Sequence, residues 1–132
     1  MHHRGHWMLQ GFGYWAVEEK ATGFYIGDIG IADFKREIEP SLEGLPELGW
    51  VLAPEAHGKG YATEAVRAVL AWGETHLPAL IGPGRPLRER RMMAIIDVQH
   101  KGSIRVAEKC GFTECGRTKF MDEPVVMFER RF

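Results

Sequence analysis

The sequence of 132 residues lacks most features that mark a specialised class of protein. Its two cysteines, Cys110 and Cys115, are too few for a disulfide-stabilised fold and are not spaced as a metal-binding pair. It has no excess of one charge, because its formal net charge is −1, whereas nucleic acids and anionic membranes select basic surfaces. No apolar run approaches the roughly 18 residues of a membrane-spanning helix, and the start does not resemble a secretory signal. We therefore expect a cytoplasmic protein that binds small molecules or proteins.

The composition is that of one ordinary domain. Hydrophobic residues make up 45% of the chain, which is enough to build a core at this length. We predict a single domain over residues 1–132, in which residues 1–12 are an N-terminal extension or the remnant of a truncated helix. The histidines near the start favour a frayed end over a metal site, so no metal is expected.

Hydrophobic periodicity divides the chain into alternating strands and helices, which predicts an α/β fold with a mixed sheet. The links 35–46 and 77–91 carry prolines and glycines typical of loops. A helix over 60–76 has small and apolar residues at spacings of three and four, so one face should pack on the sheet. We expect strands over 14–19, 24–34, 48–53, 92–98, 112–120 and 125–132, a second helix over 103–109, and a turn at 122–124.

The most informative segment, residues 47–66, joins an apolar strand, a short loop with two glycines and the start of a helix. Gly58 and Gly60 remove side chains where the backbone would approach a ligand closely. The N–H groups of 58–63 open a helix, and such groups attract an anion. Lys59 adds a positive charge. The segment therefore predicts a phosphate-binding site.

Two better-known phosphate loops do not fit this segment. A Walker loop places Lys and Ser or Thr after its second glycine, whereas Lys59 lies between Gly58 and Gly60. A Rossmann fingerprint requires Gly or Ala where Thr63 stands, followed by an acid about twenty residues later at the end of a strand. The corresponding part of this chain is the link 77–91, which is rich in Pro and Arg.

The residues from His57 to Ala62 resemble the Gln/Arg-x-x-Gly-x-Gly/Ala pyrophosphate loop of the GCN5-related N-acetyltransferases (GNAT), with His in place of Gln or Arg. Three further blocks, 13–30, 47–55 and 103–112, resemble the RimJ/RimL-like branch in order and spacing. The resemblance implies a twisted, mostly antiparallel sheet with flanking helices, in which the parallel strands around 50–52 and 92–98 splay apart. It also implies that the usual first strand and helices are missing, so we expect an N-terminally shortened chain.

The same resemblance implies that acetyl-CoA is the cosubstrate. Its pantetheine arm would lie between the splayed strands and pair with the backbone of Trp50, Val51 and Leu52. Its pyrophosphate would meet the glycine loop. Thr63 could contact a phosphate or satisfy a helix N–H, and His57 could contact the pyrophosphate through its backbone or its ring. The expected cofactor-binding residues are Trp50, Val51, Leu52, His57, Gly58, Lys59, Gly60, Tyr61, Ala62, Thr63, His100 and Ser103.

Acetyl transfer to an amine requires an unprotonated nucleophile, stabilisation of charge on the thioester oxygen and a proton for the thiolate. Glu47 is the favoured general base, ahead of Glu55 and Asp33. By resemblance, the backbone N–H of Val51 or Leu52 would meet the oxygen. The tyrosine that many relatives use as an acid corresponds to Ala107, so the sequence gives no support for a tyrosine acid.

Two further residues are candidates for catalysis. His100 stands where the family pattern has Asn, and it could keep a hydrogen bond to the cofactor, act as a proton shuttle, or do neither. Ser103 could cap the second helix and also reach the pantetheine or the sulfur.

The sequence thus predicts an N-acetyltransferase that moves an acetyl group from acetyl-CoA to a primary amine, either a protein N-terminus or a small molecule, in a ternary complex. The alternative is a catalytically weak acyl-CoA-binding or assembly module. The missing N-terminal elements would expose apolar surface, which predicts a homodimer.

Overall fold

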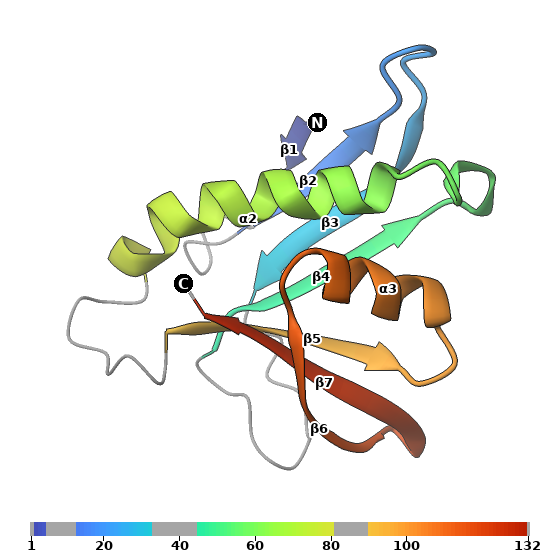
Figure 1. Cartoon of the computed structure of the whole chain (residues 1–132). Helices are drawn as coiled ribbons and strands as arrows, with labels where there is room; N and C mark the ends of the chain where they lie inside the picture. Colours follow the sequence, from blue (N-terminus) through green and yellow to red (C-terminus); the bar gives the residue numbers. More distant parts are fainter. Residues whose placement is uncertain (1, 5–12, 33–44, 81–89, 132) are drawn as a thin grey trace.

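The computed structural model describes residues 2–4, 13–32, 45–80 and 90–131 (Figure 1). Asp33, the link 35–44 and the link 81–89 lie outside the described residues. The elements, in chain order, are β1 (His2–Arg4), β2 (Gly13–Glu18), β3 (Tyr25–Ala32), β4 (Glu47–Leu52), the 3-10 helix η1 (Pro54–Ala56), α2 (Tyr61–Leu80), β5 (Arg91–Asp97), α3 (Lys101–Lys109), β6 (Thr113–Phe120) and β7 (Glu123–Arg131).

The described strands form one mixed sheet in the order β1-β2-β3-β4-β5-β7-β6. Neighbours pair antiparallel except β4 and β5, which are parallel. Both α2 and α3 lie across the same face of this sheet (Figure 1). The mixed α/β fold predicted from the sequence is therefore confirmed. No helix in the described ranges is long and apolar enough to cross a membrane.

The main core lies between the two helices and the sheet. Buried residues on α2 are Ala65, Val66, Val69 and Leu70, which repeat at the helical spacing that the sequence predicted. Trp15 of β2 meets Trp72 of α2 edge to face, with ring centroids 5.2 Å apart. Each buried Val or Leu side chain contributes about 1.5–3 kcal/mol, so this face holds α2 to the sheet. A smaller cluster on the opposite face includes Leu45, Met93, Val125 and Met127.

Both helices differ from their predicted bounds. α2 continues to Leu80, beyond the predicted end at His76, so Pro78 lies in its last turn. α3 begins at Lys101 rather than Ser103, since Oδ1 of Asp97 accepts the N–H of Gln99 at 2.8 Å and turns the chain there. His100 occupies the cap position, and the N–H of Ile104 donates to its carbonyl at 3.0 Å. The predicted capping role of Ser103 is therefore wrong.

Two short segments also differ from expectation. Residues 2–4, expected in an extension or helix remnant, are strand and pair with β2. The β6–β7 turn consists of Met121 and Asp122, with φ of 51° and 66°, rather than 122–124. Positive φ at both residues matches the twist of a two-residue hairpin, so Pro124 lies within β7 instead of in the turn.

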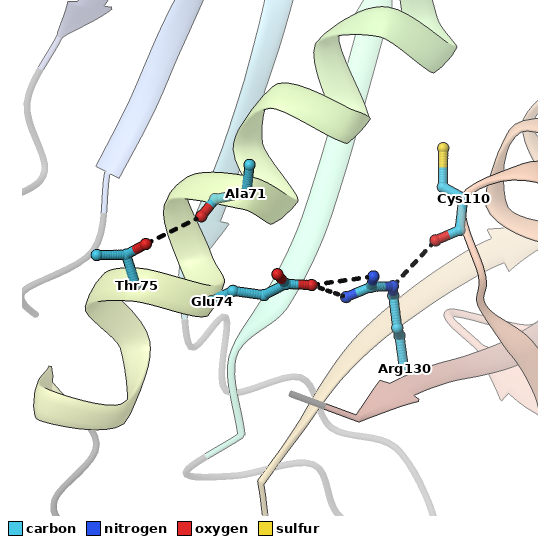
Figure 2. A network of polar contacts seen from close by, with 5 residues as sticks. All are labelled: Ala71, Glu74, Thr75, Cys110 and Arg130. Atoms are coloured by element: carbon cyan, nitrogen blue, oxygen red, sulfur yellow. Dashed lines mark hydrogen bonds and ion pairs between the residues drawn. The ribbon is translucent and has the colours of Figure 1, made fainter.

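Arg130 of β7 connects the two helices to the sheet (Figure 2). Its Nε donates to the carbonyl of Cys110, at the end of α3, at 3.0 Å. Its Nη1 and Nη2 both donate to Oε1 of Glu74 on α2 at 3.1 Å. The last carbonyls of a helix have no partner within the helix, so the bond to Cys110 satisfies a group that would otherwise need water.

We expect Arg130→Ala to lower the free energy of unfolding by roughly 1–2 kcal/mol, because it removes a charged donor from a helix end. Glu74→Ala should cost less, since the Glu74 side chain is 55% exposed and surface ion pairs contribute little. Arg131→Ala is the matched control and should leave stability unchanged. Urea denaturation of the variants measures this. An Arg130→Ala loss no larger than that of Arg131→Ala would contradict the role of Arg130.

Candidate functional site

A first cavity, of about 620 Å³, opens between the end of β4, the loop before α2, and α3. Every residue predicted to bind the cofactor lines it, with the exception of Lys59. The full lining consists of Trp50, Val51, Leu52, Ala56, His57, Gly58, Gly60, Tyr61, Ala62, Thr63, His100, Gly102, Ser103, Arg105, Val106 and Lys109.

The wall of this cavity exists because β4 and β5 separate. Their parallel pairing has a single register point, Glu47 opposite Met93. The N–H of Met93 donates to the carbonyl of Pro46 at 2.9 Å, whereas the N–H of Ala53 donates to Ile26 of β3 at 2.8 Å. Because backbone groups alternate sides along a strand, the even-numbered residues Trp50 and Leu52 direct theirs toward the gap.

The alternation also separates the backbone N–H groups of Val51 and Leu52, the two candidates from the sequence. Val51 has the same parity as Ala53, so its N–H points toward β3, where Val51 pairs with Asp28. Leu52 directs its N–H at the gap. The Val51 side chain is 73% exposed and lies on the rim of the cavity.

The loop between β4 and α2 presents open backbone. Gly58 and Gly60 have φ of 77° and 79°, values that side chains disfavour, and a Cβ built on either would meet no atom within 4 Å. The N–H groups of 61–63 precede the first helical bond, from Glu64 to the carbonyl of Gly60 at 3.1 Å. The helix therefore opens toward the cavity with unpaired donors of the kind that bind anions.

His57 ties this loop to the strand end. Its Nε2 lies 2.9 Å from the carbonyl oxygen of Leu52. A carbonyl only accepts, so Nε2 carries the proton and donates. The ring therefore contacts the protein backbone, while His57 also lines the cavity.

Lys59 is directed away from the first cavity. Its Nζ lies 3.9 Å from Oε2 of Glu19, which follows the end of β2. The hydroxyl of Tyr61 donates to the same oxygen at 2.6 Å. This hydrogen bond lowers the pKa of Glu19 and raises the pKa of Tyr61. The predicted positive charge of the loop is thus held beside a carboxylate.

Two cations that the sequence reasoning missed line the first cavity. Arg105 and Lys109 lie on α3, one helical turn apart, on the face shared with Gly102 and Val106. No Asp or Glu of the described chain lines this cavity, so its charged side chains are positive. The residues of α3 that line the cavity recur at helical spacing between Gly102 and Lys109. This spacing would have identified Arg105 and Lys109 as lining residues once the position of α3 was known.

A second cavity, of about 550 Å³, shares Trp50, Val51, His100 and Ser103 with the first. Its charge is opposite, because four carboxylates line it and no Lys or Arg of the described residues does. Tyr14, Trp50 and Phe120 supply aromatic walls. The four carboxylates belong to Asp28, Glu47, Asp97 and Glu123.

Glu47 is the buried member of this group, with 4% of its surface exposed. Asp28 accepts the hydroxyl of Tyr25 at 2.6 Å, and Asp97 is engaged by the N–H of Gln99. Of the weaker candidate bases, Glu55 is exposed on η1 and lines neither cavity. The structure thus brings Glu47, His100 and Ser103 to one site.

Ala107 is fully buried in the main core and lines neither cavity. Within the parts of the chain that the structure describes, no group of three or more His, Cys, Asp or Glu side chains could hold a metal ion.

Comparison with known proteins supports what this geometry suggests. The family profile described as "Acetyltransferase (GNAT) domain" matches residues 1–113. The chain belongs to the GNAT acetyltransferase family. The RimJ/RimL-like branch stays a prediction.

Several proteins are similar to this GNAT chain. It is 33% identical over 124 residues to the uncharacterised protein YkkB of Bacillus subtilis (strain 168), covering 92% of this chain and 62% of YkkB. The chain thus spans less than two thirds of that relative. An acetyltransferase structure from Agrobacterium tumefaciens (strain C58) is 26% identical, with a TM-score of 0.70 and coverage of 96% of this chain and 64% of that one. An aminoglycoside acetyltransferase in complex with coenzyme A shares the fold, at 18% identity, TM-score 0.69, and coverage of 95% and 69%.

Proposed function

We propose that this chain binds acetyl-CoA in the first cavity and transfers its acetyl group to a primary amine held in the second cavity. One observation carries the proposal: two cavities of opposite charge meet at Trp50, Val51, His100 and Ser103. GNAT acetyltransferases use acetyl-CoA as the donor, and the family assignment favours the same donor here. A cytoplasmic location and a homodimer remain predictions.

The first cavity fits a long, polyanionic donor. The amides of the glycine loop and of 61–63 would bind the pyrophosphate, and Arg105 and Lys109 would neutralise further phosphate charge. Trp50 would offer its backbone groups to the pantetheine amides, as an added strand would. These contacts would put the acyl end of the donor where the two cavities meet.

The second cavity fits a cationic acceptor. Amines are mostly protonated at neutral pH, so four carboxylates and aromatic walls would attract the ammonium form. The buried Glu47 would then accept the proton that the amine must lose before its nitrogen attacks the thioester carbon. Bound acetyl-CoA supplies an activated acetyl group, and the carbon–sulfur bond breaks as the carbon–nitrogen bond forms.

Three protein groups would assist the transfer. The N–H of Leu52 is directed at the gap and would donate to the oxygen on which negative charge develops. The sulfur leaves as a thiolate that takes up a proton, and His100 and Ser103, which line both cavities, would deliver it.

The proposal is tested by titrating the protein with acetyl-CoA and measuring thiol release with a panel of monoamines, diamines and N-terminal peptides. We expect saturable binding and release that depends on the acceptor. Cys110 is buried, whereas Cys115 is exposed and would itself react with the thiol reagent, so a blank without acceptor corrects for it. Binding without release would favour the weak acyl-CoA-binding module. Absence of binding would refute both readings.

Gly60→Leu should weaken binding of coenzyme A at least tenfold, because the new side chain would project into the open space beside the loop amides. The positive φ adds a strain of about 1–2 kcal/mol, so the variant should remain folded. Calorimetric titration measures the affinity, and urea denaturation confirms the fold. Unchanged affinity in a folded variant would remove the loop from the site.

Glu47→Gln should lower kcat by roughly 100-fold, the scale of a lost general base, while the affinity for acetyl-CoA stays the same. Gln keeps the size of the buried side chain but cannot take up the proton. Glu55→Gln is the matched control and should leave kcat unchanged, since Glu55 lines neither cavity. Steady-state kinetics over a range of pH provide the measurement, and an unchanged pH profile for Glu47→Gln would clear Glu47 of this role.

A further inference from the structure

Glu19 lies outside both cavities, yet its side chain contacts two residues of the phosphate-binding loop, Lys59 and Tyr61. Tyr61, the first residue of α2, donates its hydroxyl to Oε2 of Glu19 at 2.6 Å, and Nζ of Lys59 lies 3.9 Å from the same oxygen. Tyr61 lines the first cavity, whereas Glu19 and Lys59 do not. Any effect of Glu19 on a bound donor must therefore act through the loop.

Glu19 is itself held in place by the turn between β2 and β3. Its other oxygen, Oε1, accepts the hydroxyl of Thr22 at 3.0 Å, and the Thr22 hydroxyl accepts the N–H of Phe24 at 3.1 Å. The backbone of Glu19 also makes three hydrogen bonds within this turn: its N–H donates to the carbonyl of Phe24 at 2.9 Å, and its carbonyl accepts the N–H groups of Gly23 at 2.7 Å and Thr22 at 3.3 Å. The Glu19 side chain is 18% exposed. A fixed carboxylate thus connects the hairpin turn to the loop.

The loop needs such a partner because its own conformation is weakly determined. Gly58 and Gly60 allow many backbone conformations, and side chains built there would touch nothing. Lys59 stands between these glycines, and Tyr61 follows them. Holding both side chains restricts Gly60 from both sides and Gly58 from one, which would keep the amides of 58–63 aimed at one point.

We propose that Glu19 is a positioning residue for phosphate binding, which orders the glycine loop through Tyr61 and Lys59. This inference rests on the proposed binding of acetyl-CoA in the first cavity. It concerns affinity for the phosphate-bearing part of the donor and leaves the chemical step unassigned. The ordered arrangement is favoured at neutral pH, because the Tyr61 hydroxyl lowers the pKa of the Glu19 carboxyl and keeps it ionised.

Whether coenzyme A binds more weakly or more tightly after the charge of Glu19 is removed distinguishes this ordering role from simple electrostatic repulsion. A carboxylate near a polyanion repels it, so removing the charge of Glu19 would strengthen coenzyme A binding if charge alone mattered. If Glu19 orders the loop, Glu19→Gln would weaken that binding instead. Glu55→Gln removes a carboxylate from η1, in the same connection, without touching the loop side chains, so it measures the purely electrostatic effect.

The experiment measures the dissociation constants of coenzyme A and of pantetheine, which lacks phosphates, for the wild type and four variants: Glu19→Gln, Tyr61→Phe, the double variant and Glu55→Gln. We expect Glu19→Gln, which replaces the charge-assisted hydrogen bond with a weaker neutral one and removes the ion pair with Lys59, and Tyr61→Phe, which removes the hydrogen bond, each to weaken coenzyme A binding about fivefold. The double variant should lose little more, because both changes remove one shared contact. Pantetheine binding should stay the same, and Glu55→Gln should bind coenzyme A as well as the wild type or better.

Amide hydrogen exchange over residues 57–63 gives a second readout that needs no ligand. Faster exchange in Glu19→Gln and Tyr61→Phe, but not in Glu55→Gln, supports the ordering role. Coenzyme A affinity in Glu19→Gln that equals or exceeds that of Glu55→Gln would overturn it. If the wild type does not bind coenzyme A, the proposed function fails, and the exchange result alone decides whether Glu19 orders the loop, with unchanged exchange refuting it.

Discussion

The separation of β4 from β5 is the constraint on which the rest of the site depends. A parallel pair normally continues its hydrogen bonds along both strands, but here the pairing has one register point, at Glu47 and Met93. Beyond it, β4 stays bonded to β3 on one side and presents Trp50 and Leu52 on the other. An open strand edge can be completed by an extended ligand that pairs with it, which is the arrangement proposed for the pantetheine arm.

The separation of β4 from β5 also keeps positive and negative side chains in different cavities. Because the strands part, the helix-covered side of the sheet and its other side communicate through the gap, and each side has its own cavity. Positive side chains of α3 line one cavity, while carboxylates from β3, β4, the end of β5 and the start of β7 line the other. A molecule with net charge −1 thus keeps two fields of opposite sign close together. This arrangement suits two substrates of opposite charge that must meet at one point.

Local patterns in the sequence were enough to predict the strands, the face of α2 and the glycine loop, because each is encoded over a few consecutive residues. The features that the sequence did not predict depend on contacts between distant segments or on the geometry of turns. Nothing near Lys59 indicates that its partner is Glu19, and the roles of Arg105 and Lys109 follow only from the position of α3 beside the loop. The start of α3 was misplaced because an aspartate turn, rather than a serine cap, begins it. The carboxylates of the second cavity come from separate strands, and only the sheet order brings them together.

His57 shows how a departure from a family pattern can keep a geometric function. The pattern has Gln or Arg at this position, and the imidazole here donates from Nε2 to the carbonyl of Leu52. That contact closes the connection around η1, whose Ala56 is buried, and fixes the glycine loop relative to the end of β4. This bond joins the loop of the proposed phosphate-binding end to the strand end beside the proposed acyl end, so one side chain connects the two parts of the proposed donor site.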